Sequence, residues 1–120
     1  MNLLTNEQRD RLLANGRLRL SVAAERPECE IDFFPVVKLF TPDAGCTWLL
    51  TELDPEDGDT AFGLCDLGMG CPELGYVSLG ELASVRGRLG LPVERDLHFA
   101  PRYSIGEYAA RARTDGRLSA

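Results

Sequence analysis

Three apolar segments separated by short turn-forming stretches place the strongest constraint on how this chain can fold. They cover residues 36–41, 47–53 and 61–67, and Pro, Gly and Asp residues bound them. Connections this short favour hairpins, so successive strands are expected to be antiparallel. Residues 47–53 are apolar on both faces, which predicts a strand covered on both sides, either by helices or by a second subunit.

The strand expected over residues 61–67 has one shallow face, because its alternate side chains are those of Ala61, Gly63 and Cys65. A helix can approach such a face closely. We therefore expect a helix to lie there, and a ligand groove is the less favoured alternative.

The N-terminal caps of three helices are visible in the sequence. Thr5, Ser78 and Ser104 each stand three residues before a Gln or Glu, which is the spacing of a capping box. The expected helices cover about residues 6–15, ended by Gly16, then residues 79–86, and a last helix that starts at residue 105 and ends before Gly116.

Two further strands are expected over residues 75–77 and 93–99. Residues 17–35 lack a clear period and are expected to form an irregular connection, and residues 117–120 are expected to fray. A chain of 120 residues can bury a core of its own. The prediction is one α+β domain over residues 1–120, with an N-terminal helix, an antiparallel sheet of four to five strands and two helices in the C-terminal half.

Charge is segregated along the chain, whose net charge is -6. Residues 41–85 contain nine acids and no Lys or Arg, and five of these acids lie within residues 52–59, in a loop between two apolar strands. A cluster of like charges steers and selects a partner of opposite charge. We expect a docking surface for a protein with a basic surface, made by Glu52, Asp54, Glu56, Asp57, Asp59 and Asp66. The alternative is a solvated hairpin tip that keeps a sheet edge soluble.

Direct binding to nucleic acid is disfavoured, since phosphate contacts need clustered Lys and Arg. The exception is a regulator that uses the C-terminal arginines, which are Arg102, Arg111, Arg113 and Arg117. A solvated helix face is the favoured reading of these residues.

One group of residues suggests an enzyme. Glu94, Asp96 and His98 alternate along the strand expected over residues 93–99, so they would share one face of it. Two carboxylates and an imidazole could hold a divalent cation or perform acid–base chemistry. A small metal-dependent or acid–base enzyme is therefore an alternative, ranked below protein binding because any half-exposed strand alternates in this way.

No cofactor or structural metal is expected. The closest cysteine pair, Cys65 and Cys71, lacks the C-x-x-C spacing of zinc sites, and all four thiols are expected to be free. The Gly-rich residues 68–70 lack the third Gly of a dinucleotide loop and predict a hairpin instead. The amino terminus has no signal-peptide pattern and no apolar run could span a membrane, so a cytoplasmic protein is expected.

Five segments of the chain resemble the bacterial family DUF2958, a family of unknown function. They are residues 35–42, 47–56, 61–68, 72–79 and 91–96, and the resemblance covers about residues 3–112. Members are small proteins common on plasmids and integrative elements, near genes for antirestriction and DNA maintenance, and no catalytic residue carries over. The resemblance implies an accessory protein of a mobile genetic element. With the acidic segment, it leads us to expect a non-enzymatic protein that binds a host or defence protein, and the oligomeric state stays open.

Overall fold

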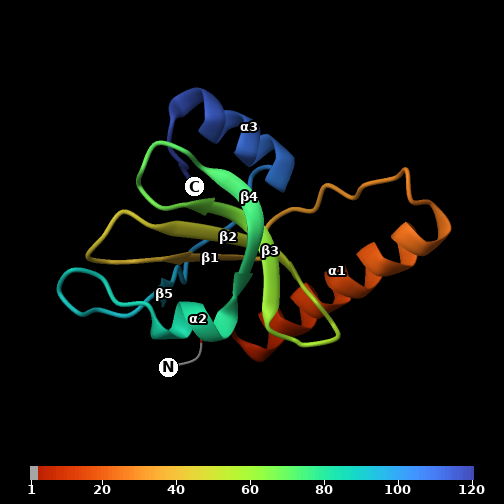
Figure 1. The fold of residues 1–120 in the computed structure, drawn as a ribbon, viewed down its shortest axis with the longest axis horizontal. Helices are drawn as coiled ribbons and strands as arrows, with labels where there is room; N and C mark the ends of the chain where they lie inside the picture. The colour runs from red at the N-terminus through yellow and green to blue at the C-terminus, as the bar shows by residue number, and fades with distance from the viewer. Residues whose placement is uncertain (1–2) are drawn as a thin grey trace.

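A five-stranded antiparallel sheet lies at the centre of the computed structural model, which describes residues 3–120 (Figure 1). The strand order is β4-β3-β2-β1-β5. The strands are β1 (Val37–Phe40), β2 (Thr47–Leu53), β3 (Thr60–Asp66), β4 (Glu73–Ser78) and β5 (Glu94–Arg95). The expected α+β fold is confirmed. Met1 and Asn2, which belong to the amino terminus expected to lack a signal peptide, lie outside the described residues.

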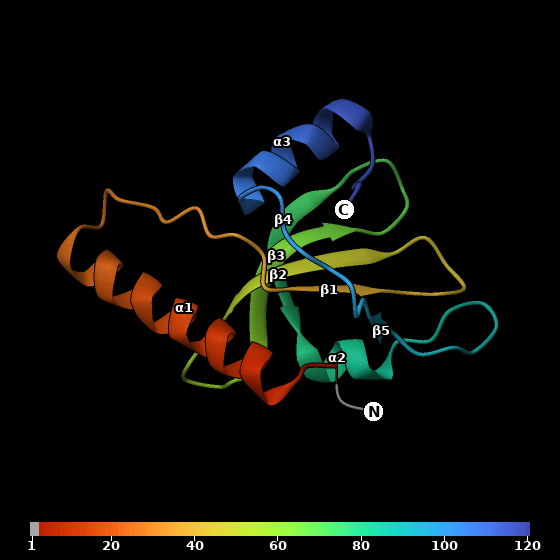
Figure 2. The same cartoon turned by 180° about the vertical axis from the view of Figure 1, so that it is seen from behind.

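Three helices, α1 (Asn6–Glu25), α2 (Leu79–Ser84) and α3 (Ile105–Asp115), cover the two faces of the sheet (Figures 1 and 2). Leu12 of α1 and Leu82 of α2 share one core cluster with Leu50 of β2. On the opposite face, Tyr108 of α3 packs in a second cluster with Leu49 of β2. Helices therefore cover both apolar faces of β2, which settles the alternative that the sequence left open.

The three expected N-caps are present, and at Thr5 the capping box is complete, because Gln8 Oε1 accepts the Thr5 N–H at 3.0 Å. The side-chain oxygens of Thr5, Ser78 and Ser104 accept the backbone N–H of residues 8, 81 and 107 at 3.0, 3.2 and 3.3 Å. These bonds satisfy N–H groups that a helix start leaves unpaired. The helix starts are therefore set by local sequence. Helix α2 ends at Ser84, earlier than expected, because Val85 is extended and Arg86 forms a β-bridge with Pro92.

Helix α1 does not end at Gly16, which corrects the expected range. The helix continues to Glu25, and its C-terminal half projects beyond the sheet (Figure 2). Gly16 is buried against β2, where a Cβ would overlap the carbonyl oxygen of Leu53. Glycine is thus present for a close approach of two backbones, not for a left-handed stop. The irregular connection expected over residues 17–35 is confined to residues 26–36.

The strand expected over residues 93–99 is also shorter than predicted, since β5 contains only Glu94 and Arg95. The backbone N–H of Asp96 still donates to the carbonyl oxygen of Lys38 in β1. The Asp96 carboxylate, however, accepts the N–H of His98 at 2.8 Å, and the chain turns there. Leu97, which alternates with these polar residues, is 73% exposed. Alternation alone did not distinguish a strand from this turning connection.

The C-terminal tail is docked, contrary to the expectation that residues 117–120 fray. The N–H of Leu118 donates to Asp66 at 2.8 Å, and Lys38 Nζ donates to the backbone oxygen of Ala120 at 2.7 Å. Leu118 also packs beside the core cluster under α3. The tail therefore closes over the sheet end where Asp66 lies.

Candidate functional site

The strand β4 forms one edge of the sheet and is the least covered of the longer strands. It follows β3 without a register shift over residues 73–78, so it is a regular strand with one side unpaired. Leu74 and Tyr76 are 40% and 75% exposed. An open, partly apolar edge of this kind is unusual in proteins that have no use for it.

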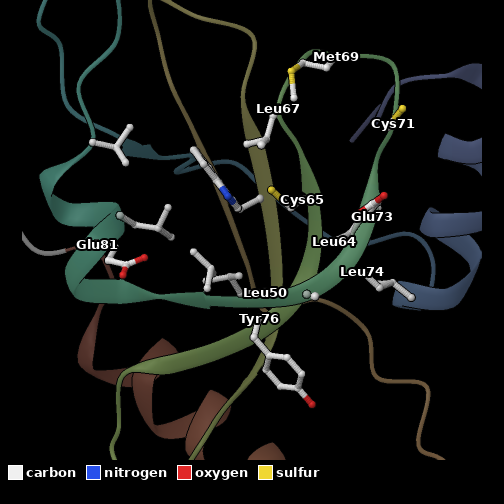
Figure 3. Close-up of a pocket in the computed structure, with 16 residues that line it drawn as sticks. Leu50, Leu64, Cys65, Leu67, Met69, Cys71, Glu73, Leu74, Tyr76 and Glu81 are labelled. Carbon is white, nitrogen blue, oxygen red and sulfur yellow. The ribbon is translucent and has the colours of Figure 1, made fainter.

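An apolar groove of about 490 Å3 lies beside β4, between the β3–β4 hairpin and α2 (Figure 3). Its volume falls in the range of roughly 300–1,000 Å3 typical of ligand sites. Trp48 and Leu50 line it from β2, and Leu82 and Val85 line it from α2 and its C-terminal cap. Hairpin residues complete the lining: Gly63, Leu64, Cys65, Leu67, Met69, Cys71, Glu73, Leu74, Gly75, Tyr76 and Val77. Of these, Leu74 and Tyr76 lie at the border, and their side chains point away from the hollow (Figure 3).

The groove occupies part of the shallow face of β3, so that expectation needs a partial correction. Helix α2 does lie close at one end, where Ala61 is buried in the same cluster as Leu79 and Leu82. Cys65 is half-buried and lines the groove, whereas Gly63 is buried against β2, where a Cβ would overlap the carbonyl oxygen of Leu49. A Cβ placed on neighbouring Gly75 would meet no heavy atom within 4 Å. Small residues on adjacent strands therefore create a hollow here. The sequence favoured a covering helix over such a groove.

Among residues 3–120, two charged side chains line the groove, and both are acidic. Glu73 at the start of β4 and Glu81 on α2 are exposed on opposite sides of the hollow (Figure 3). No Lys or Arg lines it, since the whole segment of residues 41–85 lacks them. The groove thus combines an apolar floor with a negative rim.

The thiol of Cys65 on the groove floor is held in its neutral form. Burial raises its pKa, the neighbouring Cys46, Asp66 and Glu73 raise it further, and a hydrogen bond from Trp48 offsets part of the shift. A nucleophilic cysteine needs the opposite shift, toward the thiolate. Cys65 therefore acts as a small apolar side chain here, and all four cysteines are unpaired in the structure.

The structure does not bring the six expected docking carboxylates together on one surface. Glu52 is buried, and its Oε1 accepts Arg19 Nε at 2.6 Å. Burial raises the pKa of Glu52, while the hydrogen bond and charge of Arg19 lower it in part. Asp66 is buried as well and accepts the N–H groups of Gly68 and Leu118, both at 2.8 Å. These two residues are structural acceptors, which contradicts their expected place on a surface.

Three more of these acids shape the loop between β2 and β3. Asp54 accepts the N–H of Glu56, and Asp57 accepts those of Asp59 and Thr60, at 2.8 to 3.0 Å. These bonds lower the pKa of Asp57, the bond from Thr60 most strongly. The Asp59 carboxylate accepts hydrogen bonds from Ser78 and Gly80 at the start of α2. Glu56 and Asp57 are the exposed members of the set.

Glu94, Asp96 and His98 do not share a strand face, because the chain turns after Asp96. The Asp96 carboxylate lies 3.6 Å from Lys38 Nζ, and Glu94 and His98 are both exposed. Within residues 3–120, no three His, Cys, Asp or Glu side chains are placed to hold a metal ion. The geometry gives the enzyme alternative no assembled site at this position.

The C-terminal arginines gather only in part. Arg102 and Arg111 line a hollow of about 400 Å3 beside α3, but Arg113 and Arg117 do not. Arg111 lies 4.0 Å from the ring centre of Tyr103 and pairs with Glu107 at 3.4 Å. Its charge is thus partly neutralised on its own helix.

None of the helices in the described part of the chain is long and apolar enough to cross a membrane.

Fold and site together define a small α+β domain with an open sheet edge beside an acid-rimmed apolar groove. The family model described as "Protein of unknown function (DUF2958)" matches residues 3–119, and the chain belongs to this family. That confirms the family expected from the five sequence segments. No curated protein and no solved structure matches the chain.

The sequence did not indicate Glu73, Gly75 and Glu81 as parts of one site. A Gly inside a strand is a sign of close approach or open space, and Gly75 is such a residue. Combined with the absence of basic residues from 41 to 85, that signal could have directed attention to β4 rather than to the acidic loop.

Proposed function

We propose that this protein is a non-enzymatic accessory protein that binds another protein by holding an apolar segment with basic ends in the groove beside β4. The observation that supports this most directly is the lining of the groove. It is mostly apolar over about 490 Å3, and the charged groups that the described residues bring to it are the carboxylates of Glu73 and Glu81. An apolar segment gains from burial on the floor, and basic ends gain from the negative rim.

Charge outside the groove supports the same partner chemistry. Exposed Glu56 and Asp57 lie in the loop between β2 and β3, and Asp59 of this loop bonds to the N-terminal end of α2. The negative field of the groove therefore extends beyond that end of the helix. Such a field raises the rate of encounter with a basic surface and repels an acidic one. In this proposal the acidic loop steers the partner and the groove holds it.

The biological setting is part of the proposal and is supported by the family resemblance. An accessory protein of a mobile genetic element meets host or defence proteins in the cytoplasm, and such a protein is the proposed partner. Neither the hollow beside α3 nor the turn at Asp96 offers a comparable combination of lining and charge.

Selection from a random-peptide display library tests the proposal without assuming a partner. We expect the wild-type protein to enrich peptides that combine apolar residues with Lys or Arg. The double variant Glu73→Lys, Glu81→Lys should lose this enrichment because the rim changes sign. The matched control is Glu28→Lys, Glu94→Lys, which makes the same change in charge at two exposed positions outside the groove.

Two outcomes would contradict the proposal. One is that wild type enriches no peptides over a blank surface. The other is that the rim variant and the control variant enrich the same peptides as wild type.

A further inference from the structure

We propose, building on the proposed function, that the bound segment is extended and joins the sheet as a sixth strand along the free edge of β4. A strand at a sheet edge directs the N–H and C=O of alternate residues outward, where they can pair with an incoming strand. β4 is six residues long and pairs with β3 on one side only. It therefore offers an unused set of backbone hydrogen-bonding groups directly beside the groove.

The two edge strands of this sheet differ in how well they are protected against pairing with another strand, which supports a binding role for β4. Proteins protect edges with very short strands, Lys or Pro residues, or bulges. The opposite edge strand, β5, is only two residues long. In contrast, β4 contains no Pro, Lys or Arg, and its register with β3 is regular throughout. The edge at β5 is thus protected by its shortness, whereas the single charged residue of β4 is Glu73 at its first position, and the rest of that edge carries no charge, Pro or bulge.

Side chains on both faces of β4 are open to an added strand. On one face, Gly75 and Val77 line the groove. On the other face, Leu74 and Tyr76 are exposed, and the Tyr76 ring meets Phe62 edge-on at 5.1 Å between ring centres. Since strand side chains alternate, every second residue of the guest would enter the groove and the others would pass over Leu74 and Tyr76.

Charge favours a foreign basic strand over a second copy of this chain. A second copy paired edge to edge would bring another Glu73 and Glu81 to a rim that holds no cation. The added negative charge would raise the repulsion around the groove, whereas Lys or Arg at the ends of a guest strand would neutralise it. The occupant is therefore an extended segment with apolar residues at alternate positions and basic residues at its ends.

The probe is the synthetic peptide acetyl-Lys-Lys-Val-Thr-Val-Thr-Val-Lys-Lys-amide, titrated into the full chain. We compare it with three derivatives that carry backbone N-methyl groups on the valines, on the threonines, or on both. N-methylation removes hydrogen-bond donors and leaves every side chain and charge in place. We expect the fully methylated peptide to bind about tenfold more weakly or worse, and at least one of the half-methylated peptides to bind within about threefold of the parent.

A second readout follows β4 itself. Addition of the parent peptide should slow hydrogen exchange at alternate amides of residues 73–78, because only the outward N–H groups gain partners. Protection of all six amides, or of none, contradicts strand addition.

Strand addition is wrong if the fully methylated peptide binds as well as the parent, if all three derivatives lose binding equally, or if the parent does not bind. The first result leaves the proposed function intact, provided Glu73→Lys, Glu81→Lys still abolishes binding. When the parent fails to bind and library selection also yields nothing, the proposed function fails with it. Sedimentation of the free protein completes the test, since a dimer that the peptide dissociates would assign the edge to a second copy.

Discussion

At the scale of single residues, Gly16 shows how one residue type can serve two structural purposes. Its position about ten residues after the Thr5 cap predicted a left-handed helix end, but the structure uses Gly16 where α1 crosses β2. The crossing coincides with a register shift between Leu50 and Glu52. Asn15 Nδ2 donates to the carbonyl oxygen of Thr51 there, at 2.8 Å. A contact so distant along the chain leaves no local sequence signal.

Substitution Gly16→Ala should destabilise the fold by about 1–3 kcal/mol, because the added methyl group forces α1 away from β2. In a solvent-exposed helix interior the same substitution would stabilise instead. Urea unfolding measures the change. Ser21→Ala on the exposed part of α1 is the control, expected within about 0.5 kcal/mol of wild type. Equal stability of the Gly16→Ala variant would contradict the close crossing.

Glu52 should make stability depend on pH in a direction opposite to that of most carboxylates. Its pKa is raised above 4.5 in the folded state, mainly by burial, so the folded protein holds this proton more tightly than the unfolded chain. Its contribution is complete below the unfolded pKa and is lost as pH rises through the folded pKa. Relative to wild type, Glu52→Gln should therefore be more stable at about pH 7 than at about pH 4, as measured by urea unfolding at both. The reverse order would show that Arg19 outweighs burial.

At the scale of elements, α2 and α3 begin with the same kind of cap, of which the sequence indicated only a part. Each helix starts with Ser, an aliphatic residue, Gly and Glu, and each Ser and Gly binds an aspartate from a distant segment. Asp59 accepts Ser78 Oγ at 2.6 Å and Gly80 N at 2.9 Å. Asp32 does the same for Ser104 and Gly106, at 2.7 and 2.8 Å. The helix starts were predictable from these caps, but the distant aspartates were not.

The acidic loop gives a direct test of this capping role. Asp59→Ala should lower the free energy of unfolding by about 1–2 kcal/mol, because two donors at the start of α2 lose their acceptor. Glu56→Ala in the same loop removes an equal charge without a bond and should change stability by no more than about 0.5 kcal/mol. Thermal and urea unfolding compare the two. Similar losses in both variants would mean that charge, not capping, determines the stability of the loop.

Hairpins and helix starts were predictable because their signals are local, whereas helix ends and the last strand depend on tertiary contacts. The segments around residues 47–53 and 61–67 became β2 and β3 almost as expected. The segment over residues 93–99 did not, because the Asp96 carboxylate caps a turn that alternation cannot reveal. The docked tail depends on Asp66, more than fifty residues away along the chain.

At the scale of the whole molecule, the segregation of charge was readable from the sequence but its location was not. The density of acids in residues 52–59 indicated a surface, yet Glu52 is buried and Asp54, Asp57 and Asp59 accept structural hydrogen bonds. The two acids at the groove, Glu73 and Glu81, lie on consecutive elements, and the turn from β4 into α2 places them on opposite sides of the hollow. The candidate site therefore required the three-dimensional structure.

Binding of the basic probe peptide should weaken as salt is added, since the rim and the loop act through exposed charges. Raising ionic strength from about 50 mM to about 500 mM shortens the Debye length severalfold and should weaken affinity by about tenfold. Glu28→Lys, Glu94→Lys should keep this dependence because both positions lie outside the groove. Fluorescence anisotropy at both salt concentrations measures the effect. An affinity that does not change with salt would contradict electrostatic selection.

The most direct test of groove binding is the affinity of the probe peptide for a Gly75→Val variant. A Cβ at this position meets nothing within 4 Å, and Gly75 lines the groove, so we expect the valine side chain to extend into the space that the guest would use. We predict that the variant has a free energy of unfolding no lower than that of wild type and binds the peptide more weakly by about tenfold or more. If Gly75→Val folds normally and binds the peptide as tightly as wild type, the groove is not the binding site.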